Sequence, residues 1–287
     1  MVFDCCGHDL VGVLSHGKAD ARLAVLIVVG GPQYRVGSHR SFVFLARAIA
    51  AKGIPVLRFD MRGMGDSEGE RPGNTESVRD VGTAVDTLFQ AVESLDGVVL
   101  LGLCDGATAS ILYARSDPRV LGLVLLNPWI RSSSDLRQRN RSFFGWPGLT
   151  GRHGALRFPS LESKHGLQGS RSSRLSAVWG VMRRALERRR VSTELATEVT
   201  KCLLQFDGEA LVLISGRDSV GREFLEHSKS RGIDNSAKRN FQLLPDAKHT
   251  FPSRKDLGVV GSICVAWLER LSVGVTQRLL SRHNRPD

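Results

Sequence analysis

The stretch "LLGLCDGATAS", residues 100–110, joins an apolar run to a series of small residues through a cysteine that stands between glycines. The spacing is Gly-x-Cys-x-Gly, centred on Cys104. A nucleophile on a sharp turn between a strand and a helix needs small neighbours, because the backbones approach closely there. A small buried cysteine explains the same spacing, so the stretch alone leaves both interpretations open.

Apolar runs along the rest of the chain predict the sheet to which this turn belongs. They are rich in Val, Ile and Leu and occupy residues 23–29, 54–59, 98–101, 121–126 and 210–214. Uninterrupted runs of this kind are typical of strands buried on both faces of a parallel sheet. Between them, apolar residues recur at helical spacing, for example over 42–50 and 78–89. The sequence therefore predicts an α/β fold with a mostly parallel central sheet, helices on both faces and, over residues 1–15, an antiparallel edge hairpin.

The alternation of strands and helices stops after Trp129 and resumes at Glu209. Residues 131–205 contain 15 Lys and Arg against 5 Asp and Glu, whereas the remaining residues contain 25 against 24. This asymmetry predicts a core formed by 1–130 and 206–287, with a basic cap, or lid, inserted over 131–205. Such a cap suits an acidic partner, such as an acyl carrier protein or an anionic polysaccharide, or peripheral contact with membrane phosphates. A solvated helix face is the alternative.

Composition narrows the class of protein. The net charge is +11, but the chain has only two tyrosines and no recognised nucleic-acid-binding motif, which argues against nucleic acid as a partner. No apolar run approaches the roughly 20 residues of a membrane span, and the N-terminus lacks a secretory pattern, so we expect a cytoplasmic protein. The five cysteines have no zinc-site spacing and predict free thiols, and the sequence indicates neither a metal nor a cofactor.

Two further loops supply an acid and a base. Asp218 follows the run at 210–214, and taken alone it is typical of a helix N-cap. His249, in "LLPDAKHTF", follows another strand-like run, and taken alone it is a surface-loop histidine. The chain order is nucleophile, acid, base, and loops that follow parallel strands emerge at the same edge of the sheet. The sequence therefore predicts a Cys104–His249–Asp218 triad, in which the base accepts the thiol proton and the acid orients the base.

The loop "VVGGPQYRVGSHRSF", residues 28–42, predicts part of an oxyanion hole. Consecutive glycines let the backbone approach a substrate, and one N–H here would complement the N–H of Asp105. Pro32 has no N–H, so Gly31 and Gln33 are the candidates. The carboxylate of Asp105 opposes this chemistry, because a negative charge beside the thiol raises the thiol pKa.

Another glycine-rich stretch, "RFDMRGMGDSEG" over residues 58–69, contains Asp60 and Arg62. We interpret it as a structural turn network without a catalytic role.

Together, "GGPQYRVGSHRSF", "RFDMRGMGDSEG", "GLCDGA", "SGRD" and "DAKHTF" resemble the α/β-hydrolases, and more closely the exosortase A system-associated hydrolases of type 1. Genes of that type occur with exopolysaccharide and protein-sorting loci in Gram-negative bacteria. The resemblance implies the α/β-hydrolase fold and places Cys104, Asp218 and His249 in the triad positions, but it implies no substrate. The cysteine is similar to that of dienelactone hydrolases, which also use Cys-His-Asp.

The function predicted from these residues is acyl transfer to water, with an ester or thioester, small or carrier-bound, as the substrate. Two alternatives stay open. The first is a catalytically inactive scaffold of the same export system, because a hydrolase fold does not by itself determine an activity. The second is a dehalogenase-like enzyme with an aspartate nucleophile, but Asp105 lies one position beyond the tip of the turn.

Overall fold

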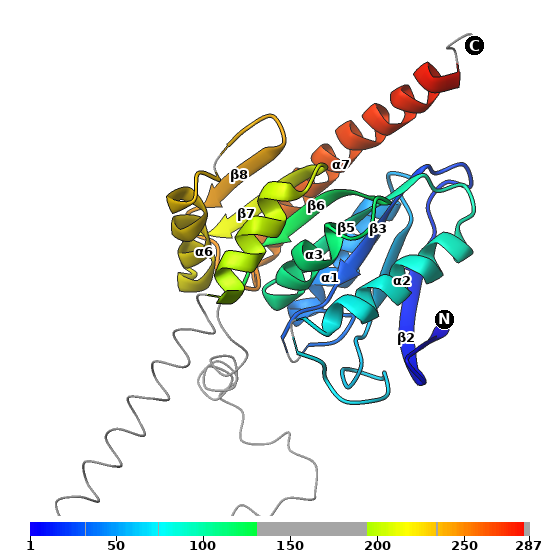
Figure 1. Ribbon diagram of the computed structural model, residues 1–287, viewed down its shortest axis with the longest axis horizontal. Helices are drawn as coiled ribbons and strands as arrows, with labels where there is room; N and C mark the ends of the chain where they lie inside the picture. Colours follow the sequence, from blue (N-terminus) through cyan, green and yellow to red (C-terminus); the bar gives the residue numbers. More distant parts are fainter. Residues whose placement is uncertain (32, 74, 131–193, 234, 284–287) are drawn as a thin grey trace, which may run out of the picture. The chain divides into compact units, whose positions relative to one another are not determined.

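The computed structural model describes residues 1–31, 33–73, 75–130, 194–233 and 235–283 (Figure 1). Eight strands in these ranges form one sheet in the order β1-β2-β4-β3-β5-β6-β7-β8. They are β1 (Val2–Cys5), β2 (His8–Ser15), β3 (Leu23–Val28), β4 (Val56–Phe59), β5 (Gly97–Leu103), β6 (Val120–Leu126), β7 (Glu209–Ser215) and β8 (Arg239–Leu244). β1 and β2 form an antiparallel hairpin, β2 is antiparallel to β4, and β3 to β8 pair in parallel. The predicted parallel sheet and edge hairpin are confirmed.

The helices cover both faces of the sheet (Figure 1). They are α1 (Ser41–Ala50), α2 (Ser77–Ala91), α3 (Asp105–Ala114), a helix over 194–205, α6 (Ser219–Ser230) and α7 (Arg254–His283), and a 3-10 turn, η1 (Ser38–Arg40), precedes α1. α1 packs against α7, and α2 packs against α3. In α2 the buried side chains recur at helical spacing, at Val81, Ala84, Val85 and Leu88, because one face of the helix lies on the sheet.

The central strands are buried along their whole length, which explains their uninterrupted apolar sequences. Every residue of β3 and every residue of β5 is buried. In a parallel sheet covered on both faces, alternate side chains all enter apolar surroundings. Each large apolar side chain buried in this way contributes about 1.5–3 kcal/mol to stability.

The segment Arg254–Val275 of α7 has the length and composition of a membrane-spanning helix, with a mean hydropathy of 1.4. Charged residues interrupt this segment, so its sequence contains no long apolar run. One face of it belongs to the core: Val260, Cys264 and Leu268 are completely buried, whereas Val259 and Val273 are exposed. On the sheet side, Trp267 and Leu271 lie against Gly122 of β6, whose missing side chain gives them room. The apolar composition of α7 is therefore that of a core helix.

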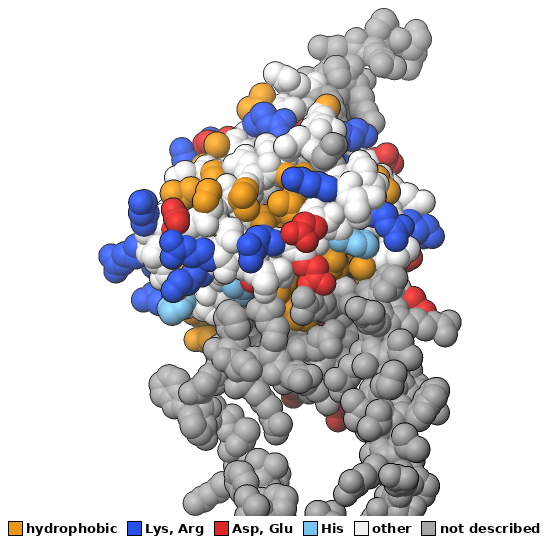
Figure 2. Space-filling view, turned by 90° about the vertical axis from the view of Figure 1, so that its left-hand side faces the viewer, with side chains coloured by type: hydrophobic (Ala, Val, Ile, Leu, Met, Phe, Trp, Pro, Cys, Tyr) orange, Lys and Arg blue, Asp and Glu red, His pale blue; other side chains and the backbone are white. Residues whose placement is uncertain are grey.

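The predicted cap, residues 131–205, falls outside the described residues up to 193. Residues 194–205 are helical, and Val199 and Leu203 in this helix are completely buried. Met1–Ile130 and Ala196–Asp287 form one compact unit. Figure 2 views the side on which α6 and β8 lie, and there Lys and Arg side chains stand among acidic and hydrophobic ones.

Candidate active site

The chain turns sharply at Cys104, between the end of β5 and the first residue of α3. The backbone angles of Cys104 are φ 60° and ψ −123°. A residue that has a Cβ adopts such angles only where the surrounding structure imposes them. The backbone N–H of Cys104 donates to the carbonyl of Leu126 over 2.9 Å. A Cβ on Gly102 would lie 2.5 Å from Ala107, and one on Gly106 would clash with the carbonyl of Val28. The two glycines are therefore required by close approach, as the sequence predicts for a nucleophile turn.

Asp218 and His249 are in direct contact. The Nδ1 atom of His249 lies 2.7 Å from Oδ2 of Asp218. Asp218 also begins α6, and its carboxylate accepts the N–H groups of Val220 and Gly221. The two interpretations of Asp218, N-cap and acid partner of a histidine, therefore hold together.

The charge state of Asp218 follows from these contacts. Burial raises the pKa of Asp218. The hydrogen bond and charge of His249 and the two backbone N–H groups lower it by more, so the pKa lies below its ordinary value. An ionised Asp218 keeps the imidazole proton on Nδ1, and Nε2 can then accept a proton from another group.

Asn127, immediately after β6, fixes the loop that carries His249. Its side-chain N–H groups donate to the carbonyl of His249 over 2.9 Å and to the hydroxyl of Ser215 over 2.8 Å. Its side-chain oxygen accepts the N–H of Ser215 over 2.7 Å. Ser215 in turn donates to the carbonyl of Lys248. Asn127 thus joins the ends of β6 and β7 to the histidine loop, and the sequence analysis missed it. The only sequence signal is a polar residue at the end of a buried run.

The loops with Cys104, Asp218 and His249 follow β5, β7 and β8. These strands run parallel to one another in the sheet. The three loops therefore emerge at the same edge of the sheet, where the strands have their carboxyl ends. The structure joins Asp218 to His249 and places Cys104 at the same edge of the sheet. The assignment of Cys104 as the nucleophile of a triad stays a prediction.

The glycine-rich loop after β3 lies directly on the turn at Cys104. A Cβ on Gly30 would clash with the carbonyl of Leu103 and with the carboxylate of Asp105. The N–H of Gly31, a predicted oxyanion donor, donates to Oδ1 of Asp105. Gly31 could therefore serve an oxyanion only by giving up this acceptor. The side chain of Gln33, the other candidate, accepts the N–H of Ser38 over 3.0 Å.

Asp105 has a second partner that the sequence analysis missed. Its Oδ2 atom lies 2.6 Å from a guanidinium nitrogen of Arg71, in the loop before α2. Burial raises the pKa of Asp105, and the charge of Arg71, the N–H of Gly31 and the charge of His249 reverse this only in part. In the sequence, Arg71 stands in the polar stretch "EGERPG", which gives no sign of its partner.

The interpretation of 58–69 as a turn network is confirmed by its hydrogen bonds. The carboxylate of Asp60 accepts the backbone N–H and the guanidinium of Arg35, and Arg35 also reaches Asp66 over 2.6 Å. Arg62 pairs with Asp80 of α2 over 2.7 Å. The bonds of Arg35 hold the loop after β3 against the loop after β4, and the bond of Arg62 holds the loop after β4 against α2.

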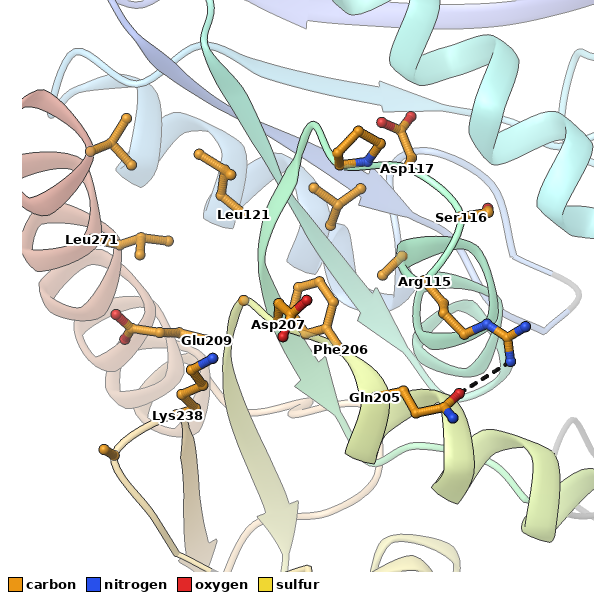
Figure 3. A pocket seen from close by; sticks show the side chains of 16 residues that line it. Arg115, Ser116, Asp117, Leu121, Gln205, Phe206, Asp207, Glu209, Lys238 and Leu271 are labelled. Atoms are coloured by element: carbon orange, nitrogen blue, oxygen red, sulfur yellow. Dashed lines mark hydrogen bonds between the residues drawn. The ribbon is translucent and has the colours of Figure 1, made fainter. Parts of the chain in front are cut away.

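A cavity of about 500 Å³ lies elsewhere, at the opposite edge of the sheet (Figure 3). It is lined by residues at the end of α3, by residues that precede or begin β6, β7 and β8, and by Leu271 and Val275 of α7. No residue of the predicted triad lines it. Among the described residues, no group of three His, Cys, Asp or Glu side chains is arranged to hold a metal ion.

Comparison with known proteins gives one family and many similar structures. The model of the family described as serine aminopeptidase, S33, matches residues 20–250. No curated protein sequence matches the chain.

The similar structures include Est1E from Butyrivibrio proteoclasticus, with ferulic acid bound, at TM-score 0.63 and 16% identity, covering 94% of this chain and 98% of that one. The esterase PF2001 of Pyrococcus furiosus has TM-score 0.63 and 17% identity, with 95% and 90% covered. The α/β hydrolase GrgF from Penicillium sp. sh18 has TM-score 0.60 and 19% identity, with 94% and 96% covered. The predicted α/β-hydrolase fold is confirmed.

Proposed function

Because the chain belongs to the serine aminopeptidase S33 family and has the α/β-hydrolase fold, we propose that it hydrolyses an ester or thioester through Cys104, His249 and Asp218. The observation that carries the proposal is the 2.7 Å contact between His249 and Asp218 at the same sheet edge as the strained turn of Cys104. The family description names a serine enzyme, whereas this chain has a cysteine at the turn. The cysteine nucleophile is therefore the specific claim of the proposal.

The reaction has two halves. In the first, Nε2 of His249 takes the proton of the Cys104 thiol, and the thiolate sulfur attacks the carbonyl carbon of the substrate. The proton then passes to the departing alcohol or thiol, and the acyl group stays on sulfur. In the second half, His249 takes a proton from water, the hydroxide attacks the thioester carbon, and the acid leaves as the thiol is restored. Asp218 stabilises the imidazolium in both halves.

The surroundings of the turn suit a developing negative charge. The first N–H groups of α3 and the positive end of its dipole lie beside Cys104, which lowers the pKa of a thiol. The N–H of Asp105 is the first oxyanion donor. The second is the N–H of Gln33, or that of Gly31 where Gly31 gives up the Asp105 carboxylate; one such donor typically contributes ~3 kcal/mol. The 2.7 Å bond to Asp218 holds the imidazole for its role as a base.

Esters and thioesters are favoured over amides. When a thiolate has added to an amide, the thiolate leaves the tetrahedral intermediate more readily than the amine does, so the adduct reverts. For this reason we do not assign to this chain the peptidase activity that the family description implies. An aminoacyl anilide, which is a peptidase substrate, is therefore one of the substrates in the test below.

The test is turnover of p-nitrophenyl esters, acyl thioesters and the anilide by the wild type, Cys104→Ala and His249→Ala. We expect the esters or thioesters to be hydrolysed, and Cys104→Ala to reduce kcat by at least about 10³-fold. Cys202→Ala, which alters another buried thiol, is the matched control and should retain activity. Equal turnover by the wild type and Cys104→Ala overturns the proposal.

A scaffold without activity is the second candidate function, and one observation favours it: the Asp105 carboxylate occupies the N–H of Gly31. Labelling with iodoacetamide separates the two. In an enzyme, Cys104 reacts faster than Cys202 and Cys264, and His249→Ala slows it. In a scaffold, the three thiols react at similar rates.

Three parts of the proposal rest on sequence. The link to exosortase and exopolysaccharide systems rests on the motif resemblance. An acidic partner at residues 131–205 rests on their charge, and a cytoplasmic location rests on composition. Binding of an acyl carrier protein that weakens steeply with salt would support the acidic partner.

A further inference from the structure

The carboxylate of Asp105 is held between two segments that are distant in sequence. One oxygen accepts the N–H of Gly31, after β3, and the other lies 2.6 Å from the guanidinium of Arg71, before α2. The Asp105 side chain is 8% exposed, whereas that of Arg71 is 35% exposed. Arg71 therefore reaches inward from the surface to a buried acid.

A negative charge at this place bears directly on the nucleophile. Asp105 follows Cys104 in the chain and is the first residue of α3. An unneutralised carboxylate here would oppose the formation of a thiolate, because like charges destabilise each other in a buried site. It would also cancel the favourable effect of the helix N-terminus.

The surroundings make the pairing strong. A cavity of about 20 Å³ beside the two side chains is lined by Val29, Met61 and Met64 and by the polar Ser77. The apolar side chains cover part of the pair, and a charge-assisted hydrogen bond over 2.6 Å to a buried carboxylate is a strong contact even where the guanidinium is partly exposed. Arg71 is followed by Pro72 and Gly73, which line the same cavity.

We propose that Arg71 is a positioning residue of the active site, which neutralises Asp105 and turns it toward Gly31 so that Cys104 can form a thiolate. This inference rests on the proposed function, since it gives Cys104 a reactive role. Arg71 acts through Asp105 and touches no reacting atom. In the part of the chain that the structure describes, the charged groups that act on Asp105 are Arg71, from the loop before α2, and His249, backed by Asp218, from the loops after β8 and β7.

The experiment is the pH dependence of Cys104 alkylation by iodoacetamide, followed peptide by peptide in the full-length protein, with no substrate. Arg71→Gln leaves the Asp105 charge unpaired and should move the apparent pKa of Cys104 upward, which lowers the alkylation rate at neutral pH by about tenfold. Asp105→Asn removes the charge but leaves Arg71, so it should move that pKa downward. Arg71→Lys keeps the charge and should restore most of the wild-type profile.

The double variant Arg71→Gln/Asp105→Asn should return the profile toward the wild type, because neither charge remains. Arg115→Gln is the matched control: Arg115 is an arginine 47% exposed that pairs with Gln205 far from the turn, and its loss should leave the profile unchanged. If Arg71→Gln fails to fold, the sign of the Asp105→Asn shift decides. An unchanged or upward profile in Asp105→Asn overturns the inference.

Failure here and failure of the proposed function give different results. Alkylation reports the thiol alone, and ester turnover reports hydrolysis. If Cys104→Ala retains full turnover while the two single variants shift the profile in opposite directions, the hydrolase proposal falls and the assignment of Arg71 stands. If Cys104→Ala abolishes turnover and Arg71→Gln leaves the alkylation profile unchanged, the hydrolase proposal stands and the assignment of Arg71 falls.

Discussion

Two buried carboxylates stand at similar places in this fold and differ in almost everything else. Asp218 and Asp105 each lie at the start of a helix that follows a buried strand, and they are 3% and 7% exposed. Asp218 is held by two N–H groups of its own helix and by His249, and its pKa is lowered. Asp105 is held by Gly31 and Arg71 from two other loops, and its pKa is raised, because burial outweighs these partners. The balance between burial and partners therefore decides how each acid behaves: burial prevails at Asp105, and the partners prevail at Asp218.

The largest effect should come from Asp218→Asn. The asparagine oxygen can still cap α6, but the charge that fixes the His249 tautomer is lost, so we expect kcat to fall by about 10³–10⁴-fold. The free energy of unfolding should change by less than about 1 kcal/mol. Ester kinetics and urea unfolding measure the two quantities. Asp246→Asn, an exposed carboxylate near by, is the control. Full activity in Asp218→Asn would remove Asp218 from the site.

The next effect tests the hydrogen bonds by which Asn127 holds the loop that carries His249. Asn127→Ala leaves the N–H of Ser215 and the carbonyl of His249 without their side-chain partner, so we expect a loss of about 3 kcal/mol in unfolding free energy. Asn240→Ala, at an exposed position of β8, should change it little. A loss equal to that of the control would mean that the histidine loop is held by other contacts.

A smaller effect is expected on the Asp105 side. Asp105→Ala leaves the Gly31 N–H and the Arg71 guanidinium unpaired and should cost about 1–2 kcal/mol of unfolding free energy. Asp105→Asn keeps an acceptor for Gly31 and should lose less. If the two variants are equally stable, the hydrogen bond to Gly31 contributes nothing to the fold.

The smallest effect concerns the direction in which stability changes with pH. It is measured as the free energy of unfolding between about pH 3 and 6. Asp218, with its lowered pKa, stabilises the fold above its unfolded value near 3.8, and this contribution is lost as the pH falls. Asp105, with its raised pKa, acts in the opposite direction: the folded state holds its proton longer, so stability falls as the pH rises above about 3.8. Asp218→Asn should therefore lose stability relative to the wild type as the pH rises, and Asp105→Asn should gain it. Parallel curves would contradict the difference between the two acids.

The same comparison shows what the sequence can predict. The strands, the turn at Cys104 and the pairing of Asp218 with His249 depend on local apolar patterns and on the order of loops along a parallel sheet. The roles of Asn127 and Arg71 are not predicted, because no motif or loop order points to their partners: Asn127 binds Ser215, 88 residues away, and Arg71 binds Asp105, 34 residues away. Asp218 and His249 are also 31 residues apart, but the order of the loops brings them together. Gly31 was predicted as a donor, but the direction of the Asp105 side chain, which takes its N–H, follows only from the packed structure.

Trp129, two residues before the predicted cap, is hydrogen-bonded to the turn at Cys104 and to α3. The N–H of Trp129 donates to the carbonyl of Cys104 over 3.2 Å, and its own carbonyl accepts the hydroxyl of Thr108 in α3. The first part of the described core thus ends at Ile130, one residue beyond two hydrogen bonds to the turn and to α3. In engineering, we expect a replacement of residues 131–193 that keeps Trp129 to keep these two bonds, whereas a replacement that extends to 205 would also remove the buried side chains of Val199 and Leu203.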